Sequence, residues 1–151
     1  SDLMPKTKKH GKPKNKKPSS CKNQPTKKMP GVDFQPKYSK NAGEPWFTLI
    51  SLGLKKIEGR LDKGSFAEMA VGNVVEWTNE DFGHRSVITR IKRKTKYPSF
   101  RQYLEAECLS NCLPGISSLD QGVAVYHKYY SPADEAASGV VAIELEVLLV
   151  N

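Results

Sequence analysis

The sequence predicts an α+β fold, a small β-barrel flanked by short helices and preceded by a disordered lysine-rich tail. Stretches in which apolar and polar residues alternate, as in half-buried strands, are interleaved with short stretches of helical spacing. Several strands closed by short helices suit a small barrel, in which no strand edge is left open. The first 40 residues show neither pattern and are dominated by lysine, so they are predicted to lie outside the folded body.

Residues 1–40 are the predicted basic tail, and residues 41–151 the predicted folded domain. The tail holds twelve lysines against two aspartates, a net charge of +10, whereas the body holds 12 basic and 14 acidic residues. With few large apolar side chains before Phe34, the tail cannot bury enough surface to offset the entropy of ordering it. Disorder is therefore expected to about Asp33.

The tail also predicts a partner. Lysine is a compact charge on a flexible stem, which suits neutralisation of phosphates without reading of sequence, with an affinity that falls steeply as salt rises. RNA or another polyanion is the expected partner of the tail. A solubilising or nuclear-localisation role is the alternative, because localisation signals are clustered basic residues too.

The body is predicted to begin with a short helix and two strands. Residues 44–53, EPWFTLISLG, suit a helix because Pro45 is accepted in a first helical turn and Gly53 is a stop signal. Residues 55–62, KKIEGRLD, alternate as a strand does, and residues 62–66 are expected to turn. Residues 69–79, MAVGNVVEWTN, predict a second strand that ends in polar turn residues.

The second half of the body continues the alternation of strands and helices. Residues 85–97, RSVITRIKRKTKY, predict a strand with a cationic face. Residues 99–112, SFRQYLEAECLSNC, have helical spacing, with Ser99 as the N-cap. A further helical piece is expected over residues 117–131, and residues 139–150, GVVAIELEVLLV, predict a nearly continuous apolar strand.

Cysteine spacing supports neither a disulfide framework nor a zinc site. The chain has three cysteines, and Cys108 and Cys112 are four residues apart, which on one helix places both thiols on the same face. No cofactor and no metal ion is therefore predicted. No apolar run approaches the ~18 residues that a membrane span needs, so no membrane partner is predicted and an intracellular location, cytoplasmic or nuclear, is expected.

Five blocks of the body, in order, carry a resemblance to a known family. They are PWFTLISLGLKKIEGR, VGNVVEW, YPSFRQYLEAECLSNCLPG, YHKYYS and GVVAIELEVL, and over residues 44–150 the chain resembles an ASCH domain, an RNA-binding-type module related to PUA domains. The family motif G-x-K-x-x-E-x-R is matched by Gly53, Lys55, Glu58 and Arg60. The resemblance implies a small PUA-like barrel with a basic cleft between barrel and helices, in which this motif faces a nucleic acid or nucleotide.

Within that motif, Glu58 and Arg60 share one face of the predicted strand, so the carboxylate can orient the guanidinium while both address a base edge or a phosphate. Lys55 falls on the opposite face by strict alternation. It is therefore expected in the turn between helix and strand, reaching the cleft from its rim. The alternative is a surface ion pair of Glu58 with Arg60 or Lys56, which is worth little.

A second candidate nucleic-acid surface is the cationic face of residues 85–97. Its side chains are roughly 6.6 Å apart along one strand, near the spacing of phosphates in an extended strand; they are Arg90, Lys92, Lys94 and Lys96. The alternative is an exposed face whose lysines keep an edge strand from pairing.

Aromatic residues form the third candidate surface. YHKYYS places Tyr126 beside cations, the arrangement on which single-stranded RNA bases stack, although a tyrosine at helical spacing is also typical of core packing. Trp46, beside Pro45 and ahead of the basic motif, is a better base-stacking candidate than Trp77.

The predicted function is RNA binding, through a cleft that takes RNA or a nucleotide and through the polycationic tail. The resemblance also implies an alternative, an amidohydrolase acting on an acylated cytidine, with Lys55 as the motif lysine. In such relatives a hydroxyl residue stands three positions on, where this chain has Glu58, and a distant glutamate completes the set, for which neither Glu105 nor Glu107 can be assigned. Glu58 is expected to raise the pKa of Lys55, which weakens catalysis. A third hypothesis is a structural protein of a virion or ribosome whose tail docks on nucleic acid.

Overall fold

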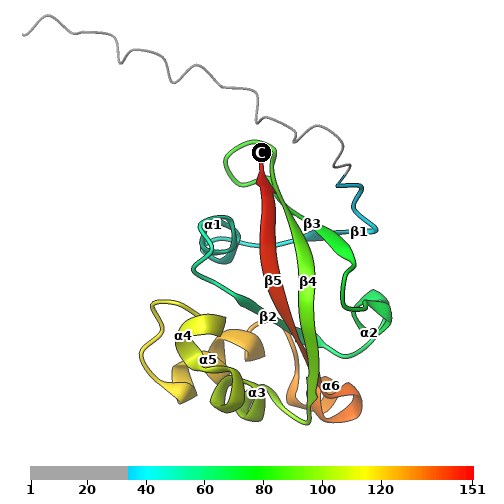
Figure 1. Cartoon of the computed structure of the whole chain (residues 1–151). Helices are drawn as coiled ribbons and strands as arrows, with labels where there is room; N and C mark the ends of the chain where they lie inside the picture. The colour runs from blue at the N-terminus through cyan, green and yellow to red at the C-terminus, as the bar shows by residue number, and fades with distance from the viewer. Residues whose placement is uncertain (1–33) are drawn as a thin grey trace, which may run out of the picture.

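The computed structural model describes residues 34–151 (Figure 1). The prediction of disorder to about Asp33 lies outside the described residues. Strand β1, Tyr38–Asn41, crosses the predicted boundary at residue 40, so the folded body begins a few residues earlier than the sequence indicated. It does so because Tyr38 and Lys40 pair with Val75 and Trp77 of a distant strand, a partner that local composition does not reveal.

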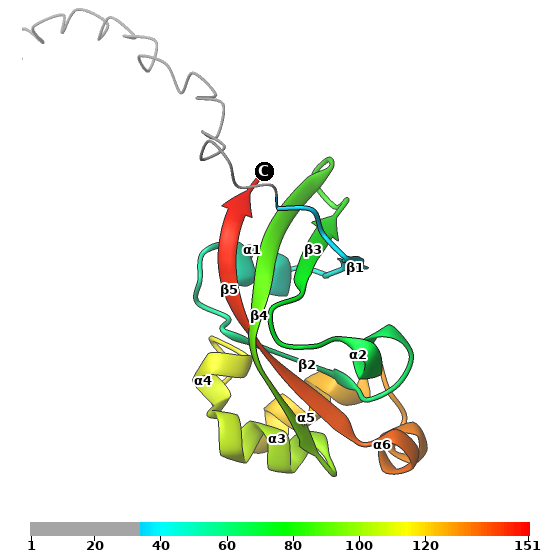
Figure 2. The ribbon, with the colours of Figure 1, turned by 45° about the vertical axis from the view of Figure 1, so that its right-hand side comes forward.

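One five-stranded mixed sheet organises the body. The strand order is β1, β3 (Val74–Asn79), β4 (Arg85–Tyr97), β5 (Val140–Val150) and β2 (Ile57–Leu61). Strands β1 and β3 are parallel, and the other neighbours are antiparallel. The long strands β4 and β5 curve across the molecule (Figure 2), with two register shifts along their pairing. The α+β, barrel-like fold is confirmed, as a half-barrel. Strands β1 and β2 are its two edges, so the expectation that no strand edge is left open is wrong.

In the described part of the chain, six short helices flank this sheet. They are α1 (Trp46–Ser51), α2 (Ser65–Glu68), α3 (Phe100–Glu107), α4 (Leu109–Cys112), α5 (Leu119–His127) and α6 (Pro132–Ser138). Helices α3, α4 and α5 gather at one end of the sheet beside β2, away from the C-terminus (Figures 1 and 2). None of the helices within residues 34–151 has the length and apolar character required to cross a bilayer.

Strand β5 separates two hydrophobic cores, which explains its nearly continuous apolar sequence. Val141, Ile143 and Leu145 pack into a core with α1 and the face of β3 that carries Trp77. Val140 and Ala142 pack on the other side, into a core with β2 and helices α3 to α5. A strand buried on both faces has no polar side, so its sequence does not alternate.

Local details of the helices differ from the prediction. The turn expected at residues 62–66 contains the start of α2, and α6 follows α5 where no separate helix was expected. The helix predicted over residues 99–112 is divided at Cys108, whose φ of 73° is in the left-handed region and ends α3. Cys108 is consequently exposed and Cys112 buried, so the prediction that the two thiols share one helical face is wrong.

Candidate functional site

A cavity of about 170 Å³ lies beside the gap between the two edge strands of the half-barrel. Its walls come from the end of β1, the start of α1, β2, and the segment from α5 to Tyr130. The lining residues are Asn41, Ala42, Gly43, Trp46, Lys55, Glu58, Gly59, Arg60, Leu113, Val125, Tyr126, Tyr129 and Tyr130. Five residues that the sequence singled out therefore meet at one cavity: Trp46, Lys55, Glu58, Arg60 and Tyr126.

Burial distinguishes the floor of this cavity from its mouth. Lys55 and Glu58 are only 2% and 5% exposed, and Tyr126 is buried with them. Tyr129 is 65% exposed, and Asn41 and Gly43 are exposed too. The charged pair thus lies at the floor, and the mouth opens beside the end of β1.

Lys55 is anchored inside the protein rather than at the rim. Its Nζ donates hydrogen bonds to the carbonyl oxygens of Ile57 (2.9 Å) and Cys112, and lies 4.0 Å from Oε1 of Glu58. The chain turns sharply after α1, with a positive φ at Gly53, and this turn directs the lysine inward. The expected approach of Lys55 from the rim is therefore wrong, because the carbonyl of Cys112 belongs to a helix 57 residues away in sequence.

The charge state of Lys55 follows its burial. Desolvation lowers the pKa of Lys55, and the nearby Glu58 carboxylate offsets only part of that effect. The expected effect of Glu58, which is to raise this pKa, is present but smaller than the effect of burial. Burial lowers the pKa of Lys55 because removal of an ammonium group from water disfavours its charged form.

Arg60 closes the gap between the edges of the sheet. Its Nη2 donates to the carbonyl oxygen of Asn41 in β1 (2.9 Å), and its Nε lies 3.6 Å from Oε1 of Glu58. Its Cζ lies 5.1 Å from the ring centroid of Phe66 and 5.5 Å from that of Trp77. A single guanidinium thus spans the two strand edges where no backbone ladder joins them.

Gly59, between the two charged residues of β2, is required by a close approach. A Cβ atom at this position would lie 2.6 Å from ring carbons of Tyr103, which is fully buried. The hydroxyl of Tyr103 is 3.0 Å from that of Tyr126. The glycine therefore lets α3 pack directly on β2 and holds the tyrosine wall of the cavity in place.

Tyr126 serves as a wall of the cavity. One face of its ring stacks on Phe100, with centroids 4.3 Å apart and planes 7° from parallel, and Tyr103 meets it edge-on. Burial raises the pKa of Tyr126 well above its usual value, so its hydroxyl stays neutral. Tyr129 and Tyr130 also line the cavity. Both residues belong to the YHKYYS motif, from which only Tyr126 was predicted as a nucleic-acid-binding residue.

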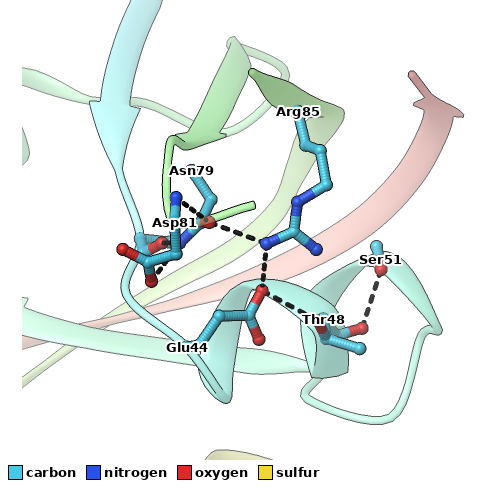
Figure 3. A network of polar contacts seen from close by, with 7 residues as sticks. Glu44, Thr48, Ser51, Asn79, Asp81 and Arg85 are labelled. Atoms are coloured by element: carbon cyan, nitrogen blue, oxygen red, sulfur yellow. Dashed lines mark hydrogen bonds and ion pairs between the residues drawn. The ribbon is translucent and has the colours of Figure 1, made fainter. Parts of the chain in front are cut away.

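A polar network that the sequence did not reveal holds the rim of the cavity (Figure 3). Glu44 Oε1 accepts hydrogen bonds from Arg85 Nη2 (2.7 Å) and Thr48 Oγ1 (2.8 Å). Asn79 accepts from the same Arg85 nitrogen through Oδ1 (2.7 Å) and donates through Nδ2 to the carbonyl of Ala42 (2.9 Å). The ends of β3 and β4 thereby fix the segment from Ala42 to Glu44, which forms one side of the mouth.

The cationic residues of β4 do not reach the cavity. Arg90 Nη1 lies 3.7 Å from Glu146 Oε2 on β5, and Lys94 Nζ donates to the carbonyls of Ala67 (2.8 Å) and Met69 (2.6 Å). Lys92 is exposed on the same strand. The structure thus separates Arg90, Lys92 and Lys94 from the motif residues, because β3 and β5 flank β4 in the sheet.

Neither glutamate considered for the enzyme alternative lines the cavity. Glu107 accepts hydrogen bonds from Arg93 and from the hydroxyl of Tyr97 (2.6 Å), and Glu105 is exposed on α3. Within residues 34–151, no group of three or more histidine, cysteine, aspartate and glutamate side chains is placed to hold a metal ion.

Comparisons with known proteins agree with this architecture. The ASCH domain family matches residues 42–149. The crystal structure of hypothetical protein PH0355 is similar at 33% identity and a TM-score of 0.67, covering 74% of this chain and 98% of that one. The solution structure of protein PF0455 from Pyrococcus furiosus is similar at 37% identity and a TM-score of 0.62, covering 74% of this chain and 96% of that one. A comparison with curated proteins found no match.

Proposed function

We propose that this chain, which belongs to the ASCH domain family of PUA-like folds, binds RNA and takes one base into the cavity beside β1, β2 and α5. The observation that carries the proposal is the convergence of Lys55, Glu58 and Arg60 on a single cavity whose walls include Trp46 and Tyr126. A planar, polar-edged and largely apolar ligand suits such a site.

The chemistry of the floor supports recognition of a base edge. Glu58 accepts a hydrogen bond from its neighbouring amide through Oε1 (3.1 Å), and Arg60 approaches the same oxygen. A carboxylate has two acceptor oxygens, so Oε2 is available to accept from an N–H group of a ligand. Lys55 and Arg60 hold the carboxylate in place, which gives the site a fixed acceptor at its floor.

An uncharged nucleoside provides the sharpest test, because it has no phosphate to bind the lysine-rich tail. Nucleosides are titrated into the full chain by calorimetry and NMR, with Glu58→Gln as the variant and Glu146→Gln, on the exposed part of β5, as the matched control. We expect Glu58→Gln to weaken binding at least tenfold, about 1.4 kcal/mol, and Glu146→Gln to leave it unchanged. Equal affinities for the two variants, or no perturbation of the Trp46 indole signal in wild type, would refute the proposal.

An amidohydrolase acting on an acylated cytidine is the second candidate. The observation that favours it is the lowered pKa of Lys55 in the cavity, since a neutral amine can act as base or nucleophile. Against it, the two backbone carbonyls that accept hydrogen bonds from Nζ, and the Glu58 carboxylate 4.0 Å away, favour the charged ammonium form, which has no lone pair. Incubation of wild type and Lys55→Ala with acetylcytidine decides between the two: turnover lost in the variant supports the enzyme, and intact substrate supports a binding module.

The predicted tail would add affinity of a different kind. Its lysines contribute contacts to phosphates that depend on salt and not on base identity. The contributions of the cavity and of the tail can therefore be measured separately. Nucleoside binding measures the cavity, and the salt dependence of RNA binding measures the tail.

A further inference from the structure

We propose that single-stranded RNA continues from the cavity along strand β1, over a surface that we call the β1 track. This surface consists of Lys37, Tyr38, Lys40, Arg60 and Phe66. The inference rests on the proposed function and deepens it, because it makes the ligand a polynucleotide whose backbone runs in one direction rather than a free nucleotide.

The track is a series of cations held against aromatic rings. Lys40 Nζ lies 5.1 Å from the ring centroid of Phe66, and Arg60 Cζ lies 5.1 Å from the same centroid. Lys37 Nζ lies 5.7 Å from the ring centroid of Tyr38. A ring face attracts a cation without using up its N–H donors, so these groups are positioned and still able to bind phosphate oxygens.

The track is continuous with the mouth of the cavity. Arg60 lines the cavity and also contacts Phe66, so it belongs to both. Its bond to the carbonyl of Asn41 joins it to the end of β1, where the exposed Asn41 marks the mouth. From there β1 leads back through Lys40 to Tyr38, which lie two apart and share one face of the strand.

The cations of the track differ from those of β4 in their partners. Arg90 faces a carboxylate on β5 and Lys94 donates to backbone carbonyls. Among the ion pairs of residues 34–151, none engages Lys37 or Lys40. Glu76 approaches β1 from its other face, where its Oε1 accepts from Ser39 at 3.4 Å. Within residues 34–151 no ion pair thus neutralises Lys37 or Lys40, whereas the third cation of the track, Arg60, is paired with Glu58.

These features match one general requirement of single-strand binding, a cationic path for the nucleic-acid backbone. With a base in the cavity, Arg60 lies where the first phosphate emerges and Lys40 and Lys37 follow along β1. In the sequence, Lys37 is followed toward the N-terminus by residues 1–33, which hold ten lysines.

The test compares two ligands on the full chain, a mixed-sequence single-stranded RNA of eight nucleotides and a nucleoside. The variants are Lys40→Gln and Lys37→Gln, and the matched control is Lys56→Gln, which removes one exposed lysine that does not line the cavity. We expect each track variant to weaken binding of the RNA about fivefold and to reduce the slope of log affinity against log salt by about 0.7, as expected for one phosphate contact to a single strand. Nucleoside affinity should stay within twofold of wild type, and Lys56→Gln should change neither ligand's affinity.

The possible failures are distinguishable. If track and control variants bind the RNA equally while the nucleoside still binds, the track is refuted and the cavity stands. If wild type binds no nucleoside, the proposed function is refuted, and with it the inference that rests on it. Thermal unfolding of every variant controls for folding, and Lys37 provides an exposed position should the contact of Lys40 with Phe66 matter for stability.

Discussion

Replacement of Arg60 by lysine keeps the charge but removes the planar fork of donors. In the structure this guanidinium reaches the Asn41 carbonyl, the Glu58 carboxylate and the rings of Phe66 and Trp77 together. An ammonium group on a flexible stem can retain only part of that set. Arg60→Lys therefore tests whether geometry, and not charge alone, closes the half-barrel.

The expected size of the effect follows from the contacts. A hydrogen bond from a charged donor contributes about 1.5–3 kcal/mol, and each partly exposed contact of a cation with a ring about 0.5–1 kcal/mol. Lysine recovers some of these, so Arg60→Lys should lower the free energy of unfolding by about 1.5–3 kcal/mol and Tm by roughly 5–10 °C. Arg60→Ala should cost at least as much, because it also removes the aliphatic stem.

Urea unfolding followed by tryptophan fluorescence measures this loss, and the Trp77 ring lies 5.5 Å from the Arg60 Cζ. Arg90→Lys is the matched control, since its ion pair with Glu146 is exposed and worth under about 1 kcal/mol. Nucleoside affinity is measured on the same proteins, and Arg60→Lys should weaken it nearly as much as Arg60→Ala. If Arg60→Lys matches Arg90→Lys in stability and binds nucleosides like wild type, the reasoning is refuted.

Three further predictions follow from the site and the tail. Gly59→Ala should destabilise the protein by about 1–3 kcal/mol, because its Cβ would lie 2.6 Å from the buried Tyr103 ring; an unchanged Tm would contradict the close approach. The pKa of Lys55 is lower in the folded protein than its unfolded value of 10.5. Between these two pKa values the unfolded chain binds more protons than the folded one, so the free energy of unfolding rises with pH in that range. The free energy of unfolding of wild type relative to Lys55→Met should therefore increase from pH 7 to pH 10, and a constant difference would contradict it. Deletion of residues 1–33 removes ten lysines and should flatten the salt dependence of RNA binding; an unchanged slope, with a native circular dichroism spectrum as the folding control, would exclude the tail from binding.

Much of the local structure was encoded in short stretches of sequence. Ser99 caps α3 by accepting a hydrogen bond from the amide of Gln102, as its position ahead of an amphipathic stretch indicated. The alternation of residues 57–61 gave a strand in which Glu58 and Arg60 lie two apart and approach each other. Such features depend on backbone preferences and on neighbours a few residues away, so a single sequence contains the information for them.

The sequence by itself thus determined the α+β class, most strands and helices, and the motif whose residues converge on the cavity. Only the tertiary structure decided how those residues are used. Lys55 is buried where a carbonyl from α4 accepts a hydrogen bond from its Nζ, and Arg60 bridges the sheet edges because β1 ends opposite β2. Arg90 and Lys94 lie away from the cavity because they contact Glu146 on β5 and the carbonyl of Met69 beside α2. Burial and pairing depend on groups distant in sequence, and those distances are set by the packing of the whole domain rather than by local pattern.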